Sequence, residues 1–118
     1  MNTVMQAVFV ELPAFERSRE GYLDDAGFGR LQKTLMANPE AGEVIQGTGG
    51  LRKLRFSDAR RSKGKRGGLR VIYYYWAGGP EFWLFPLYDK DEMGDLTPKQ
   101  REVLKERIKD ELRARRKS

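Results

Sequence analysis

Three cations, Lys53, Arg55 and Arg70, are the residues of this chain best suited to chemistry. They belong to a stretch, residues 52–70, that holds nine Lys or Arg side chains and one acid, Asp58. This density of positive charge favours a polyanion, and phosphate is the obvious counterpart. Guanidinium groups held together can stabilise the charge that collects on phosphoryl oxygens when a ribose 2′-hydroxyl attacks the adjacent phosphate. The three residues are therefore candidates for catalysing RNA cleavage.

Strand alternation predicts that these cations face one groove. Leu54 and Phe56 belong in the core, so Lys53 and Arg55, at the alternate positions, point away from it. Arg70 opens the next strand on the face opposite its apolar neighbours. Surrounding Arg charges disfavour the ammonium form of a lysine, which makes Lys53 the candidate general base. Further RNA contacts are expected from one strand residue, the intervening loop and an aromatic that could stack on a base: Arg52, Lys63, Lys65, Arg66 and Tyr74.

Plainer interpretations stand beside these. A loop rich in Lys and Arg is most often a solvated surface, or one that binds phosphate without chemistry. Tyr74 and its aromatic neighbours are more typical of a hairpin core than of a base platform. Residues 47–50 indicate a turn, since no Gly-Lys-Ser/Thr follows them. The acids after the last strand favour a solvated connector over a metal site: Asp89, Asp91, Glu92 and Asp95.

Composition excludes several classes of enzyme. The 118 residues include no Cys and no His, which rules out a thiolate nucleophile, a Ser-His-Asp triad and zinc bound by either residue. The net charge of +6 is localised: residues 1–50 sum to −3, residues 51–70 to +8 and residues 71–118 to +1. A localised patch steers a charged ligand. We expect one domain, 1–118, with no membrane-spanning segment or signal peptide, and hence a cytoplasmic location.

Periodicity and turn signals predict the elements that position the cations. We expect strands at 4–10, 51–57, 69–76 and 82–88. Helices are expected to begin at Pro13, at Asp24 or Asp25, and after Thr97, whose capping box with Gln100 precedes an apolar stripe of Val103, Leu104, Ile108 and Leu112. Residues 42–50 are expected to form a loop, and residues 113–117 a frayed tail. The order β-α-α-β-β-β-α favours an α+β fold, with a small, mostly antiparallel sheet packed with helices.

Two segments carry a family resemblance. Residues 47–55 (GTGGLRKLR) and 64–74 (GKRGGLRVIYY) resemble the HigB-like branch of the RelE/HigB superfamily, toxins of bacterial type II toxin–antitoxin modules. The resemblance covers nearly the whole chain. It implies a RelE-like fold and an mRNA endonuclease that cuts on the translating ribosome without a metal or other cofactor. It also implies a cognate antitoxin, of the helix-turn-helix type, that neutralises the toxin.

The resemblance also implies roles for residues. RelE has two basic residues two positions apart on one strand and an Arg that opens the next, and Lys53, Arg55 and Arg70 match them. Its catalytic C-terminal Tyr has no counterpart here, because residues 97–118 contain no aromatic. Its Arg after the last strand corresponds to Asp91, or to Lys90 with a shift of one residue.

Tyr88 is the candidate to replace the missing catalytic Tyr. A simple hairpin register across residues 77–80 pairs Tyr88 with Leu69, on the core face and away from Arg70. A β-bulge would be needed to turn Tyr88 toward Arg70.

Two other functions fit the same residues. In the first, the basic stretch 52–70 binds ribosomal RNA or another nucleic acid without cleaving it. In the second, the basic groove serves mainly to receive an acidic segment of the antitoxin.

Overall fold

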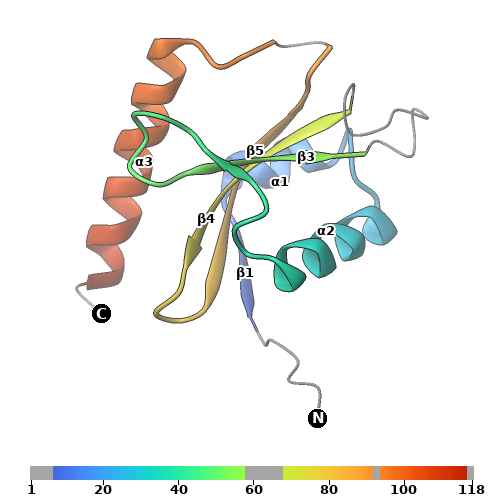
Figure 1. Ribbon diagram of the computed structural model, residues 1–118, viewed down its shortest axis with the longest axis horizontal. Coiled ribbons are helices and arrows are strands. Elements are labelled where there is room, and N and C mark those ends of the chain that lie inside the picture. Colours follow the sequence, from blue (N-terminus) through green and yellow to red (C-terminus); the bar gives the residue numbers. More distant parts are fainter. Residues whose placement is uncertain (1–6, 58–67, 92–93, 117–118) are drawn as a thin grey trace.

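A five-stranded sheet forms the centre of the computed structural model, which describes residues 7–57, 68–91 and 94–116 (Figure 1). The strands lie in the order β1-β5-β4-β3-β2. β1 pairs with β5 in parallel, and the other three pairs are antiparallel. The predicted α+β class with a mostly antiparallel sheet is confirmed. The strand bounds are β1 Val8–Glu11, β2 Glu43–Val44, β3 Arg52–Phe56, β4 Leu69–Trp76 and β5 Glu81–Asp89.

Local capping signals set where the helices begin. Helix α1 (Pro13–Arg19) starts with proline in its first turn, and helix α2 (Asp25–Ala37) follows Asp24, whose carboxylate accepts a hydrogen bond from Gly27 N at 2.7 Å. Helix α3 (Pro98–Arg116) has the predicted capping box: Thr97 N donates to Gln100 Oε1 at 2.8 Å, and Gln100 N donates to Thr97 Oγ1 at 3.1 Å. No helix in the described ranges combines the length and apolar character that a membrane span requires.

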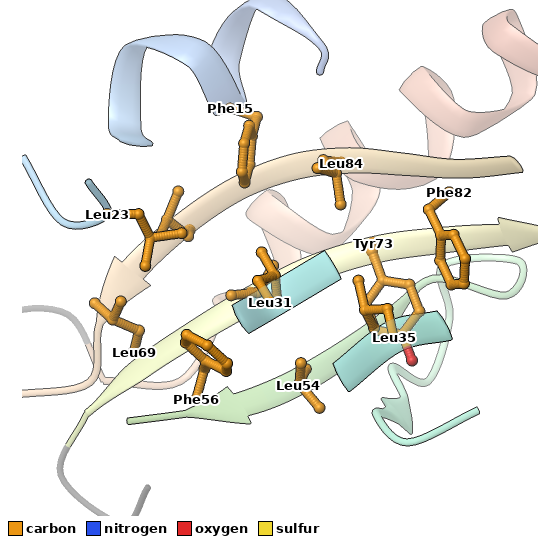
Figure 2. Packing of buried hydrophobic residues seen from close by; sticks show 12 residues of the cluster. Phe15, Leu23, Leu31, Leu35, Leu54, Phe56, Leu69, Tyr73, Phe82 and Leu84 are labelled. Atoms are coloured by element: carbon orange, nitrogen blue, oxygen red, sulfur yellow. The ribbon is translucent and has the colours of Figure 1, made fainter. Parts of the chain in front are cut away.

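The first face of the sheet is covered by α1 and α2. Figure 2 shows side chains from these helices and from β3, β4 and β5 converging on one space. Phe15 comes from α1, Leu31 and Leu35 from α2, and all three are fully buried. Leu54 and Phe56 of β3 point into this cluster, as their alternation with the cations predicts.

The second face of the sheet is covered by α3 over part of its area. Leu104, Ile108 and Leu112 pack with a cluster that includes Trp83 and Tyr88 of β5. Val103, predicted to belong to the same stripe, is 58% exposed. That prediction was wrong, because Val103 precedes Leu104 and so lies about 100° away from it around the helix.

Three other expectations are corrected. Residues 42–50 are not all loop, since β2 pairs Glu43 with Lys53 and Val44 with Arg52. The described residues therefore contain one strand more than predicted. The expected frayed tail is helical through Arg116, and the first strand begins at Val8, with residues 4–6 of its predicted span outside the described residues.

A bulge interrupts the β4–β5 ladder. From the hairpin end, Trp76 pairs with Glu81 and the register holds as far as Tyr73 opposite Leu84; beyond it, Val71 pairs with Leu87. One residue of β4 thus faces two of β5, Phe85 and Pro86. Proline is tolerated at such a position because a bulge leaves a backbone group outside the ladder. Every β5 residue beyond the bulge lies one position further along than a simple hairpin would place it.

Candidate functional site

A row of three side chains crosses the middle of the sheet. Arg55 of β3 pairs with Arg70 of β4, and Arg70 pairs with Tyr88 of β5. Directly paired residues of antiparallel strands lie on the same face. Neighbouring strands are about 4.8 Å apart, so the row spans roughly 10 Å. The expected pairing of Tyr88 with Leu69 was wrong, because the bulge turns Tyr88 to the face of Arg70.

Lys53 lies on the same face as the row. It pairs with Ile72, which belongs to the cluster under α3. Its Nζ is 3.7 Å from the carboxylate of Asp95, in the segment that leads into α3. The Asp95 side chain is 84% exposed, so this ion pair is weak. The ammonium of Lys53 therefore has an anionic partner that can move away at little cost.

Arg70 is the most deeply placed cation of the row. Only 3% of its surface is exposed, and its Nη1 donates to the carbonyl oxygen of Leu69 at 3.1 Å. A guanidinium in such a position has lost most of its hydration, so its field acts on a nearby anion with less screening than at the surface. Arg55, by contrast, is exposed and can follow a flexible ligand.

Tyr88 is buried, and its hydroxyl is held in the protonated form. Burial is the main cause that raises the pKa of Tyr88 above its ordinary value of 10.0, and the carboxylate of Asp95 raises it further. The guanidinium groups of Arg70 and Arg101 act in the opposite direction. Near neutral pH the phenol is therefore a proton donor with cations close by.

Arg101 is a neighbour of this row that the sequence reading missed. It precedes Leu104 by three residues and Ile108 by seven, so it lies on the stripe of α3 that faces the sheet. It is half-buried, and its Nε is buried without a hydrogen-bond partner among the described residues. Its spacing from Leu104 and Ile108 could have identified it, but the stripe predicted from the sequence contained apolar residues alone.

Two hollows flank the site. One, of about 450 Å³, lies where β2 ends and leaves the edge of β3 open; its walls include Lys53, Arg55 and Arg30 of α2. The other, of about 490 Å³, is almost wholly apolar and includes Tyr88 and Val103. A flexible polyanion could thus meet cations at the edge of β3, and the hollow that includes Tyr88 offers apolar surface.

Of the predicted contact residues, Arg52 is not brought to this face, whereas Tyr74 lies on this face but packs under α3. Arg52 lies on the opposite face, where its Nη1 donates to the carbonyl oxygen of Gly42 at 2.8 Å and its Nη2 lies 3.8 Å from the Glu40 carboxylate. Tyr74 packs against Trp83 in the cluster under α3, with ring centroids 5.1 Å apart. Tyr74 therefore contributes to packing in the hairpin, which is the alternative to a base-stacking role given above. Three loop residues lie outside the described residues: Lys63, Lys65 and Arg66.

The acids of the connector do not act alike. Asp89 is fully buried and its Oδ1 accepts a hydrogen bond from Asp91 N at 2.7 Å, so it shapes the turn after β5 and is not a solvated group as expected. Asp95 forms the ion pair with Lys53. Within the ranges that the structure describes, no three acidic side chains converge on a metal position.

The sequence matches no family model.

Proposed function

We propose that the protein is the toxin of a type II toxin–antitoxin module and that it cleaves mRNA on the translating ribosome. The observation that carries the proposal is the row Arg55–Arg70–Tyr88 with Lys53 on the same face. The row supplies positive charge and a protonated phenol within the width of three strands. The resemblance of residues 47–55 and 64–74 to the HigB-like branch supplies the substrate and the setting.

Cleavage uses the row to bind the scissile phosphate. As the ribose 2′-oxygen attacks phosphorus, negative charge builds up on the non-bridging oxygens. Arg70 stabilises this charge from a desolvated position, and Arg55 and Lys53 do so from the open side. An Arg that holds two oxygens also keeps the attacking and leaving oxygens in line. No metal or other cofactor takes part.

Tyr88 is the proton donor in this mechanism. The bond between phosphorus and the 5′-oxygen breaks as the bond to the 2′-oxygen forms, and the phenol of Tyr88 protonates the departing 5′-oxygen. The products are a 2′,3′-cyclic phosphate and a 5′-hydroxyl. Lys53 remains the candidate base for the 2′-hydroxyl proton, and in that role it must first leave its ion pair with Asp95. A base next to the scissile phosphate packs in the apolar hollow beside Tyr88.

A cognate antitoxin, of the helix-turn-helix type, is the proposed protein partner. The cations that bind phosphate would also attract acidic side chains, so an acidic antitoxin segment could occupy the same groove. Inhibition and RNA binding would then compete for Lys53, Arg55 and Arg70.

Expression in bacteria tests this function. Wild-type protein should arrest translation, and primer extension should find new 5′ ends within translated mRNA. The variant K53A/R70K should do neither. It loses the charge of Lys53, and the lysine at position 70 keeps the buried charge but cannot bind two phosphate oxygens at once as arginine does. The control K109A/R113A removes two exposed cations from α3 and should behave as wild type. Equal toxicity of wild type and K53A/R70K would reject the assigned roles.

One observation favours a second candidate function, an RNA- or ribosome-binding module without catalysis. The ammonium of Lys53 is paired with a carboxylate, an arrangement that serves binding without a base. Such a module binds RNA with a steep salt dependence. It leaves translated mRNA intact, so the same primer-extension experiment separates the two functions.

A further inference from the structure

Helix α3 adds a cation to the site that no strand supplies. Its sheet-facing stripe is apolar at Leu104, Ile108 and Leu112, but it begins with Arg101. Side chains on a helix lean toward its N-terminus, so Arg101 reaches back over the first turn, toward Asp95 and the row. Asp95 raises the pKa of Tyr88 and Arg101 lowers it, which agrees with this placement of Arg101.

Arg101 has hydrogen-bonding capacity that no described residue uses. Its Nε is buried and has no partner in the described part of the chain. A buried donor left without an acceptor costs free energy, so such groups usually receive an oxygen from a ligand or a water molecule. Arg101 and Arg70 both act electrostatically on Tyr88, and two cations around one phenol suit an oxyanion as the missing acceptor.

Asp95 shows where that oxyanion binds. Its carboxylate contacts Lys53 from an exposed position just before the Thr97 cap. A carboxylate and a phosphate present similar oxygens to a cation. An exposed carboxylate held by one weak ion pair is readily displaced by a more highly charged group.

We propose that Arg101 completes a phosphate-binding site with Lys53 and Arg70, and that the carboxylate of Asp95 occupies this site until RNA displaces it. The proposal rests on the proposed function for the identity of the ligand as RNA. It assigns Arg101 direct contact with a phosphate oxygen, and it makes Asp95 a competitor of the substrate.

The test is equilibrium binding of a fluorescein-labelled, fully 2′-O-methylated RNA hexamer, which cannot be cut. Fluorescence anisotropy at several salt concentrations gives the Kd and its salt dependence. R101Q should weaken binding about tenfold and lower the slope of log Kd against log salt by about 0.7, the value for one lost contact to single-stranded nucleic acid. R113Q, which removes the same charge from an exposed position of α3, should change Kd less than twofold.

Measurements on Asp95 variants do not depend on how well an Arg101 variant folds. D95N should tighten binding about two- to fivefold, whereas D110N, with the same change in net charge, should leave Kd unchanged. Wild-type affinity in R101Q overturns the role of Arg101, and unchanged or weaker binding by D95N overturns the role of Asp95. If wild type binds the hexamer but cuts no mRNA, the proposed function fails while this inference stands. If wild type does not bind it, the inference fails.

Discussion

Arg70 lies directly opposite Tyr88 in the β4–β5 ladder, and this pairing exists because one residue of β4 faces two of β5. Without the extra residue, the phenol would point to the opposite face of the sheet, among the side chains under α1 and α2. A single irregularity in one strand thus puts a proton donor beside a buried guanidinium.

Tyr88→Phe should slow cleavage at least about 100-fold while leaving RNA binding intact. The ring still fills its place in the cluster under α3, but the proton for the 5′-oxygen is gone. General acid catalysis contributes about 100-fold or more, so the single-turnover rate on ribosome-bound mRNA should fall by at least that factor. The Kd for the 2′-O-methylated hexamer should change little. A variant that cuts at the wild-type rate would remove Tyr88 from the mechanism.

Tyr73 and Tyr88 should make the protein lose stability at alkaline pH. Burial is the main cause that raises the pKa of each above 10.0. The unfolded chain then releases these protons first as the pH rises. The free energy of unfolding contributed by the two phenols is therefore fully present below about pH 10 and is lost above it. Urea unfolding between pH 8 and pH 11 should show a steeper decline for wild type than for Y73F/Y88F, and parallel curves would contradict the assignment.

Gly42→Ala should destabilise the fold by about 2 kcal/mol. An added Cβ would lie 2.9 Å from a ring carbon of Tyr73 and 3.0 Å from the carbonyl carbon of Lys53, and backbone cannot step aside as a flexible side chain can. Gly29→Ala is the control, since nothing lies within 4 Å of its added Cβ, and in a helix it should stabilise by about 0.5–1 kcal/mol. Urea unfolding measures both. Equal effects of the two variants would show that the close approach at Gly42 is not tight.

Arg115→Ala should lower the free energy of unfolding by about 1–2 kcal/mol. The guanidinium lies 4.7 Å from the centre of the Trp83 ring and 3.1 Å from the Glu81 carboxylate, so it fastens the end of α3 to β5. Arg113→Ala, two residues earlier, removes an exposed contact with Asp110 and should cost less than about 0.5 kcal/mol. Comparable losses in the two variants would mean that the end of α3 is held in some other way.

Local signals were enough to predict much of the fold. The capping box at Thr97 and Gln100 satisfies backbone groups within four residues, so neighbours in sequence determine it. Alternation in 52–56 likewise sorts Leu54 from Lys53 and Arg55, because a strand offers only two faces. These parts follow from residue order alone.

The rest depends on contacts between distant segments. Glu43–Val44 is too short to show periodicity, and it is a strand because β3 offers an open edge. Arg115 was expected in a frayed tail, but Trp83 and Glu81, over thirty residues earlier, hold it. The bulge had one visible sign, Pro86 inside a strand, which marks an irregularity but does not say which residue pairs with which.

The place of Tyr88 on the cationic face is also sensitive to whether a length change in β5 is odd or even. Successive residues of a strand alternate between faces, so one amino acid inserted into β5 between the tip and Tyr88 would exchange Tyr88 and Leu87. Two inserted residues would restore the original orientation. Homologous chains can therefore elongate this hairpin in steps of two without losing the phenol from the cationic face, whereas a single-codon insertion or deletion would turn it to the opposite side.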